Sequence, residues 1–492
     1  MKHETKNIIG KSLFIISIFL FLLMILSPLA KTIIHIDEFW TIGVINLPLA
    51  ESIPLMISDV HPPLYYLVLK FIFKVLSVFG IQYNNLFILK LFSILPLGLI
   101  LIIFGTKIQK EYNWLTAGLF TLILTSVNMF VIQFLTVRMY NWALFFLLMS
   151  FIYFKGILLK SDKKSWILFT IFSVLVAYTQ YFILISTVLL YGILLVHILT
   201  NKNSEFKIRS ELKKWILSVI SAVILYLPWL FTFLSQISHR QHVLESTFPT
   251  IVNFINYFTY FTGIDSELSW ETLLFKIFAF AILIVITYIF INKYKKEPSI
   301  DNFYMGSGLI LFYLSIVFGV IIVSLSFNIF SIRYIVPIGA VLWFSICIYI
   351  GKLKNEKVLA ISLIIIFIIC LTGVSQTINF SNGLNEQGNP IDLLSSLNSE
   401  DNVIVYTQEF HYINFHNYLN ETKEYKSDFY MPYTPKNIST IENISEIPEK
   451  SNIYIIKAID YKTKNDFDNV QVDNITYEKY GSYKNIWIIH VK

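Results

Sequence analysis

The chain has 492 residues, of which 55% are hydrophobic, 16% aromatic and only 14% charged. A soluble protein of this length would expose far more charge, so the composition excludes an ordinary soluble enzyme or binding module. The formal net charge of +6 is modest, and in a chain this apolar it indicates membrane topology and not nucleic-acid binding. Both cysteines, Cys347 and Cys370, lie within apolar runs, so no disulfide framework is expected in the outer parts of the protein.

Long runs without a charged residue predict membrane spans, because a helix on the surface of a soluble protein carries a polar residue every turn or two. The first run follows Lys2, Lys6 and Lys11 and has no clear small-residue cleavage site after it, so we expect a retained first span. About eleven spans are predicted at roughly 20 residues each. They are expected near residues 11–30, 86–105, 113–132, 139–158, 166–180, 182–199, 215–233, 271–292, 303–326, 336–351 and 358–376.

Lysine and arginine gather in every second connection between these spans, which is the pattern of cytoplasmic loops. The basic residues of these connections are Lys107, Lys110, Lys155, Lys160, Lys163, Lys164, Lys202, Lys207, Arg209, Lys213, Lys214, Lys293, Lys295, Lys296, Lys352, Lys354 and Lys357. The pattern predicts a cytoplasmic N-terminus and an extracytoplasmic C-terminal tail in a multi-pass protein of the cell membrane.

Residues 63–80 are apolar but short, and Lys70 and Lys74 interrupt them. A span here would place the Lys-rich connections outside. We therefore expect a helix that lies in the outer interface with snorkelling lysines. Residues 31–85 then form one long first outer loop.

The composition becomes polar after about residue 377. Strand-like runs at Asn402–Tyr406, Asn452–Ile456 and Trp487–Val491, with a helical stretch near Ile391–Leu397, predict a small α/β domain. We expect a transmembrane domain at 1–376 and a soluble extracytoplasmic domain at 377–492.

The first candidate site is His35-Ile-Asp37-Glu38-Phe-Trp40, directly after the first span. A carboxylate held at the membrane surface could act as a general base on an acceptor hydroxyl, or as a metal ligand. A solvated acidic pair beside an interfacial tryptophan explains the same residues.

A second motif in the same loop is Asp59-Val-His61-Pro62-Pro63-Leu-Tyr65-Tyr66. Paired prolines pre-set the start of a helix, which accounts for the prolines alone. His61 could contact a phosphate or an acceptor, or it could be a structural histidine.

These motifs continue in order along the chain. They are followed by Lys90-Leu-Phe-Ser93, Arg138-Met-Tyr140, Tyr178-Thr-Gln180-Tyr181, Leu227-Pro228-Trp229 and Arg333-Tyr334. In this order the chain resembles the GT-C glycosyltransferases, and most of all the protein O-mannosyltransferases and the lipid A aminoarabinose transferase group. The resemblance covers roughly the first 375 residues. Lys90 stands where relatives usually have arginine, and Gln180 where they have histidine.

The resemblance implies an all-α polytopic GT-C-like protein with a small α/β domain, which acts on the outer face. The donor would be a dolichyl- or undecaprenyl-phosphate-linked sugar, used without nucleotide in a single inverting displacement. Asp37 would be the general base. Arg138, Arg333 and the weaker candidate Lys90 would hold the donor phosphate, because a guanidinium fork pairs well with phosphate.

The remaining residues of the predicted site would have supporting roles. Glu38 would belong to the catalytic pair and position a substrate, and Gln180 could only form hydrogen bonds. The other substrate-positioning residues would be His61, Tyr65, Tyr140 and Tyr334. Arginines at span ends also snorkel to the interface without any such role.

Several questions stay open at this stage. We expect no obligatory metal or other cofactor. The loop 234–270, with Gln236, His239, Arg240, Gln241, Asp265 and Glu267, could close over the donor, shape the acceptor site or be plainly solvated. The acceptor could be a protein, a lipid or a glycan. The competing interpretation is a lipid or solute transporter, which predicts ionisable residues near the bilayer midplane and repeat symmetry.

Overall fold

The structure is a computed structural model, and it describes most of the chain. The described residues are 3–35, 37–59, 61–80, 85–200, 205–239, 257–259, 262, 270–326, 332–387, 390–406, 413, 415, 418–419, 421–426, 439–440, 447, 452–458, 477–483 and 486–491. They form two compact units. The first contains Met1–Ala30, Val60–Tyr65 and Ile88–Asn379, and the second contains Lys31–Asp59, Tyr66–Phe87 and Phe380–Lys492. The division expected at residue 376 stays a prediction; the contacts group most of the first outer loop with the tail.

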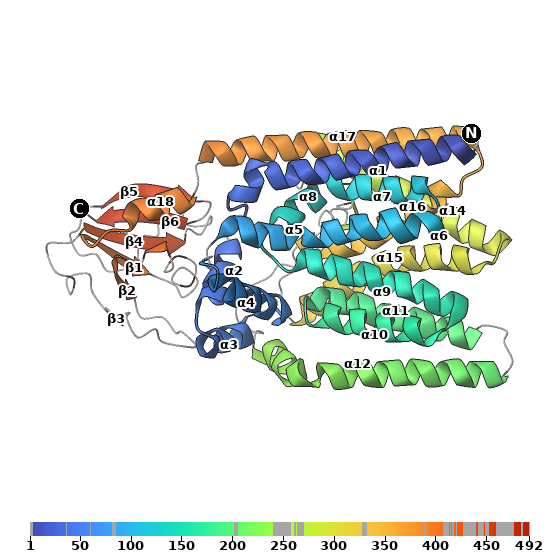
Figure 1. The fold of residues 1–492 in the computed structure, drawn as a ribbon, viewed down its shortest axis with the longest axis horizontal. Helices are drawn as coiled ribbons and strands as arrows, with labels where there is room; N and C mark the ends of the chain where they lie inside the picture. The colour runs from blue at the N-terminus through green and yellow to red at the C-terminus, as the bar shows by residue number, and fades with distance from the viewer. Residues whose placement is uncertain are drawn as a thin grey trace. The chain divides into compact units, whose positions relative to one another are not determined.

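The first unit is a bundle of helices that run along one common direction (Figure 1). Its helices are α1 (His3–Leu26), α5 (Leu86–Ile103), α6 (Gln109–Glu111), α7 (Trp114–Ser126), α8 (Asn128–Leu135), α9 (Tyr140–Lys160), α10 (Lys163–Ala177), α11 (Tyr181–Thr200), α12 (Glu205–His239), α14 (Trp270–Lys296), α15 (Ile300–Ser326), α16 (Val336–Gly351) and α17 (Glu356–Gln387). Three short turns, η1 (Pro28–Lys31), η2 (Phe104–Ile108) and η4 (Ile332–Ile335), flank them, η1 at the boundary with the second unit.

Nine helices of the described chain are long and apolar enough to cross a membrane, and the broken pair α7–α8 would make ten. The multi-pass membrane fold is thereby confirmed. Two of the eleven expected spans differ in form. The span expected at 113–132 bends by 67° between Ser126 and Asn128. The span expected at 166–180 is α10, whose 15 residues are short for a bilayer core.

The bend between α7 and α8 is supported by α17. A Cβ atom at Gly373 would lie 2.5 Å from the carbonyl oxygen of Ser126, so only glycine lets the two backbones approach this closely. The hydroxyl of Thr377 donates a hydrogen bond to the side chain of Asn128 at 2.9 Å. The bend therefore depends on residues about 250 positions away and has no proline or glycine of its own.

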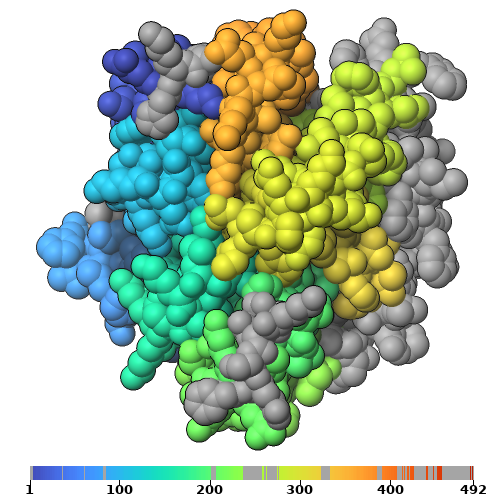
Figure 2. All heavy atoms as spheres, turned by 90° about the vertical axis from the view of Figure 1, so that its right-hand side faces the viewer, coloured from blue at the N-terminus to red at the C-terminus, as the bar shows by residue number. Residues whose placement is uncertain are grey.

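A cluster of charges around buried Lys155 joins the ends of α6, α9, α15 and α16. The Lys155 ammonium lies 3.0 Å from Glu111 and 3.2 Å from Asp301, and Lys352 lies 2.5 Å from Asp301. Lys155 also lies 3.9 Å from the centre of the Tyr112 ring. Figure 2 shows the end of the bundle that carries the Lys-rich connections, with α14, α15 and α17 around it. Because buried Lys155 has two acidic partners and a ring face, its charge is compensated inside the bundle.

The second unit combines loop helices with the tail. Its helices are α2 (Asp37–Asn46), α3 (Leu49–Ser58), most of α4 (Leu64–Ser77) and α18 (Pro390–Leu397). Its strands are β1 (Asn402–Tyr406), β2 (Lys423–Lys426), β3 (Ser439–Thr440), β4 (Asn452–Ala458), β5 (Tyr477–Tyr483) and β6 (Ile486–Val491). They form one sheet in the order β3-β2-β1-β4-β6-β5, parallel from β3 to β4 and antiparallel beyond. The small α/β fold of the tail is confirmed.

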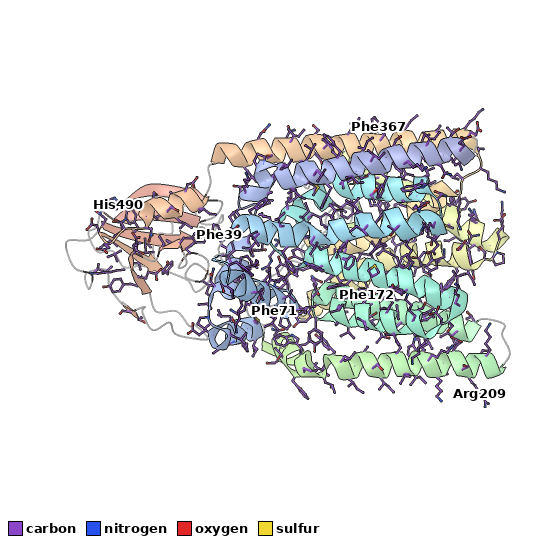
Figure 3. The ribbon with its side chains drawn as sticks, in the orientation of Figure 1. Phe39, Phe71, Phe172, Arg209, Phe367 and His490 are labelled. Carbon is purple, nitrogen blue, oxygen red and sulfur yellow. The ribbon has the colours of Figure 1, made fainter. Side chains whose placement is uncertain are left out.

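Helices α3 and α4 each expose an apolar stripe at helical spacing. On α3 it consists of Leu49, Ile53 and Ile57, and on α4 of Leu67, Phe71 and Val75. Phe71 projects from the ribbon in Figure 3. A 14-residue helix is too short to span, and a one-sided apolar stripe is typical of a helix in the membrane interface. This agrees with the interfacial helix expected at 63–80.

The predicted sidedness can be measured by cysteine labelling, because both native cysteines are buried and will give little background. We expect Glu400→Cys, in the tail, to react with a membrane-impermeant maleimide on intact cells. Lys164→Cys, in a Lys-rich connection, should react only after the cells are permeabilised. Both positions are exposed. The opposite labelling pattern would reverse the predicted topology.

Candidate active site

Arg138 is a buried cation in the first unit. It lies in the turn between α8 and α9, where its backbone N–H donates to the carbonyl of Thr136 at 2.8 Å. Only 3% of the residue is exposed. Its Nη2 atom lies 3.4 Å from Nδ1 and 3.3 Å from Nε2 of His61. Burying a guanidinium is costly unless other groups compensate its charge, so this arrangement is maintained against a desolvation penalty.

The second arginine, Arg333, lies against the same segment of α9. The guanidinium carbon of Arg333 is 5.9 Å from the centre of the Tyr140 ring, within cation–π range. The ring of Tyr140 lies 6.0 Å from that of Tyr334, and Tyr334 lies 5.9 Å from Phe182. The start of α9, which carries Tyr140 and directly follows the turn with Arg138, therefore meets the turn before α16. The described contacts thus form two groups, Arg138 with His61, and Arg333 with Tyr140 and Tyr334. Their membership of one substrate site stays a prediction.

Lys90 and Tyr65 belong to a neighbouring polar group between α4, α5 and α9. The Tyr65 hydroxyl lies 3.0 Å from the Ser93 hydroxyl, and Asn141 donates to the Ser93 carbonyl at 2.9 Å. Lys90 is one turn before Ser93 on α5 and only 1% exposed. These contacts hold the start of α4 against the bundle. The backbone N–H of Leu64 adds to them by donating to the carbonyl of Tyr178 at 3.1 Å.

Gln180 has a structural task that explains an amide at this position. Its side-chain oxygen accepts a hydrogen bond from the backbone N–H of Ile183 at 2.8 Å, at the start of α11. It therefore caps a helix whose first N–H groups have no partner within the helix. Next to it, the Tyr181 hydroxyl accepts from Trp229 at 2.7 Å and donates to Gln236 at 2.6 Å. Two motifs of the sequence, at 178–181 and 227–229, are thus in contact.

Asp37 and Glu38 start helix α2 in the second unit. Glu38 is fully buried, and its Oε2 atom accepts backbone N–H groups of Ile34 at 2.5 Å and His35 at 3.0 Å. A carboxylate that folds back onto the preceding backbone fixes the entry to a helix, as in a capping box. The side chain of Asp37 is 21% exposed, and one of its oxygens lies 3.3 Å from Nδ1 of His35. Asp37 is therefore the accessible carboxylate of the pair, and Glu38 holds the turn.

The other end of α2 is capped by Lys70 of α4. Its ammonium donates to the carbonyls of Val44 at 3.5 Å, Ile45 at 3.0 Å and Leu47. Burial lowers the pKa of Lys70 to about 8, and the charge of Glu51 acts in the opposite direction. The lysine was expected to snorkel; it instead satisfies the last carbonyls of the helix, which have no partner of their own.

Sequence reasoning assigned no role to several residues whose contacts or burial the structure shows. His35 pairs with Asp37, and the Tyr66 hydroxyl donates to the carboxylate of Asp59 at 3.0 Å. Lys276, six residues into α14, is only 2% exposed. A lysine near the outer end of an apolar span was a signal that could have found it. Of the residues proposed in the second loop, Arg240, Gln241, Asp265 and Glu267 lie outside the described residues.

Within the described part of the chain, no group of three histidine, cysteine or acidic residues is arranged to hold a metal ion. The expectation that no metal is obligatory stays a prediction. What the described arrangement offers is a set of cations and tyrosines in the first unit and one accessible carboxylate in the second. Cations suit a phosphate, and a carboxylate suits proton transfer from a hydroxyl.

Comparison with known proteins identifies the fold. No protein-family model and no curated protein matches the sequence. A solved structure shares the fold of this chain. The chain is similar to ArnT from Cupriavidus metallidurans bound to undecaprenyl phosphate, with 9% identity over 97% of both chains and a TM-score of 0.53. The apo state of ArnT is matched over the same shares with 10% identity and a TM-score of 0.47. The GT-C-like fold expected from the order of the motifs is confirmed.

The role of Lys70 can be measured directly. Lys70→Met keeps the apolar stem but removes the donor, which leaves carbonyls at the end of α2 without partners. We expect a loss of about 1–3 kcal/mol in local stability and a lower thermal midpoint of the purified protein. The matched control is Lys74→Met, because Lys74 is exposed one turn later on the same helix. Equal midpoints for the two variants would contradict the capping role.

Proposed function

We propose that this protein is a membrane glycosyltransferase that uses a polyprenyl-phosphate-linked sugar, dolichyl or undecaprenyl, as its donor. It passes the sugar to a protein, lipid or glycan acceptor on the outer membrane face. The observation that carries the proposal is the buried Arg138 guanidinium beside His61, with Arg333 against Tyr140. It occurs in a fold shared over 97% of both chains with an ArnT structure bound to undecaprenyl phosphate.

The arginines supply what the leaving group requires. When the bond between the sugar and the lipid phosphate breaks, negative charge develops on the phosphate oxygens. Donors that are already fixed in place stabilise this charge without reorganisation. Arg138 and Arg333 are oriented by His61 and Tyr140, and the planar fork of arginine pairs with two phosphate oxygens. Lys90 is a third cation of this kind, as a point charge on α5.

The proposed reaction is a single displacement with inversion. The acceptor oxygen forms a bond to the anomeric carbon while the bond from that carbon to the phosphate oxygen breaks. The acceptor proton passes to the carboxylate of Asp37, and polyprenyl phosphate leaves with the electron pair. Asp37 suits this task better than Glu38, because Glu38 is fully buried and accepts two backbone N–H groups. Glu38 then acts by holding the turn that presents Asp37.

The supporting residues have roles that follow from their contacts. Tyr140 and Tyr334 orient Arg333, and Tyr65 anchors the start of α4 through Ser93. Gln180 acts on the start of α11 and only indirectly on a substrate. The scheme requires no metal ion. The competing transporter interpretation needs ionisable groups near the bilayer midplane, whereas Arg138 lies in the turn between α8 and α9 and Lys90 is the fifth residue of α5.

The base is tested by Asp37→Asn, which keeps the shape of the side chain but removes its capacity to take a proton. Membranes containing the wild type or the variant are incubated with a panel of tritiated dolichyl- and undecaprenyl-phosphate sugars, and the labelled product is identified. We expect transfer by the wild type from one of these donors and a loss of at least about 10²-fold in the variant. Membrane content of the two proteins should be equal.

Two outcomes would go against the proposal. Full activity of Asp37→Asn would remove Asp37 from the reaction. No transfer from any donor, together with movement of the labelled lipid between leaflets of proteoliposomes, would support a transporter. The first result would reject only the role of Asp37 as the base. The second result would reject the proposed function as a whole, so the two failures are distinguishable.

The phosphate-binding role of Arg138 is tested by Arg138→Lys, which keeps the charge but loses the planar fork. Since a hydrogen bond to a charged group contributes about 1.5–3 kcal/mol, kcat/KM for the donor should fall by roughly 10- to 150-fold. The control is Arg209→Lys, in the first turns of α12, where Arg209 is labelled in Figure 3. An unchanged kcat/KM for Arg138→Lys would exclude a fork-like contact with the phosphate.

A further inference from the structure

Helix α2 is almost entirely buried although it has only ten residues. Phe39, Ile42 and Ile45 each have 0% of their surface exposed. An isolated helix of this length is marginally stable at best, so its position must come from the groups that cover it. The first residue of this helix is Asp37, the proposed base.

Three residues of the tail cover α2, namely Ile413, Phe415 and Tyr418, and they are called the tail contact below. The ring of Phe39 meets that of Phe415 edge to face at 5.2 Å and that of Tyr418 at 5.6 Å. Phe39 is marked on α2 in Figure 3. Edge-to-face pairs constrain the orientation of both rings in addition to burying them. Two such pairs on one phenylalanine limit rotation of α2 about its axis.

Gly43, one turn after Phe39, lies directly under the tail. A Cβ atom at this position would be 2.0 Å from the carbonyl oxygen of Ile413 and 2.8 Å from its side chain. Backbone therefore meets backbone, and no larger residue fits without a shift of the helix or the tail. This second point of contact limits movement of α2 toward or away from the sheet domain.

Tyr418 also acts at the start of α2. Its hydroxyl is buried and has no hydrogen-bond partner among the described residues. Burial raises the pKa of Tyr418, and the negative charge of Glu38 raises it further, so the phenol stays protonated beside that carboxylate. Glu38 holds the backbone of Ile34 and His35, the turn immediately before Asp37. The tail contact therefore acts on α2 at three places. Tyr418 lies beside Glu38 at the turn, the rings of Phe415 and Tyr418 pack on Phe39, and Ile413 lies against Gly43.

We propose that the tail contact is a positioning element for Asp37, so that sugar transfer depends on the C-terminal domain although that domain contributes no reacting group. The tail contact sets the rotation of α2 about its axis and its distance from the sheet domain, while Lys70 fixes the other end of the helix. This inference rests on the proposed function. Its physical basis is that a general base displaced by about 1 Å can lose on the order of 10²-fold in rate.

The test compares variants of the tail contact with matched controls in full-length protein. Phe415→Leu, Gly43→Ala and Tyr418→Phe alter the contact. Tyr406→Phe removes a tyrosine hydroxyl of β1 that donates to Glu424 of β2, and Gly192→Ala adds a methyl group where nothing lies within 4 Å. The substrate is the tritiated polyprenyl-phosphate sugar that the wild type uses.

We expect Phe415→Leu and Gly43→Ala to lower kcat by about tenfold or more, with donor KM changed by less than about threefold. Tyr418→Phe should lower kcat less and shift the acidic limb of the kcat–pH profile, which reports the base. The two controls should keep wild-type kcat. Folding is checked by the increase in thermal midpoint that undecaprenyl phosphate produces, which should be equal in all variants.

Three results would overturn the inference. They are wild-type kcat in Phe415→Leu and Tyr418→Phe, an equal loss in Tyr406→Phe, or a rise in acceptor KM at constant kcat, which would make the tail an acceptor-binding surface. If Asp37→Asn is inactive while Phe415→Leu and Tyr418→Phe have full activity, the proposed function stands and the positioning role does not. If the wild type transfers no sugar, the proposed function itself has failed.

Discussion

Compensation of charge in an apolar protein is the constraint on which the rest of this structure depends. A guanidinium or ammonium group withdrawn from water is costly, and the chain contains few charged residues to share that cost. Lys155 is paired with Glu111 and Asp301 and lies against Tyr112 at one set of helix ends. Arg138 has the imidazole of His61 beside it, and Arg333 has the ring of Tyr140. The first arrangement pairs its cation with carboxylates, and in the second each arginine lies against a ring.

The Lys155 network and the two arginines therefore have different effects on the protein. A lysine with two carboxylates forms a closed network that holds four helices in register. Arg138 and Arg333 lie against an imidazole and a phenol ring, and the planar fork of a guanidinium can pair with two oxygens of a phosphate. The same apolar surroundings that make such an arginine expensive also strengthen its attraction for a phosphate that enters. The free-energy cost of burying such an arginine and its attraction for a phosphate therefore have the same physical origin.

The second unit shows how a short helix obtains rigidity from segments that are distant in the sequence. Helix α2 has too few residues to be stable alone, and each part of it is held by a different segment. Glu38 ties its entry, Lys70 caps its exit, and the tail residues Phe415 and Tyr418 pack on Phe39 between them. A residue of the first loop is therefore positioned by residues more than 370 positions later in the chain.

The sequence by itself determined the features that depend only on the residues of one local segment. Transfer of a segment into lipid depends on the residues of that segment, so apolar runs predicted most spans, and the alternation in the tail predicted β1 and α18. The motifs also named Arg138 and His61, which the structure places in contact, although their role in a site stays a prediction. Only the tertiary structure decided the bend between Ser126 and Asn128, the capping role of Lys70 and the task of Glu38. Each of these depends on which donor, acceptor or glycine lies opposite, and a hydrogen bond or close packing contact forms only with a partner that folding brings within reach.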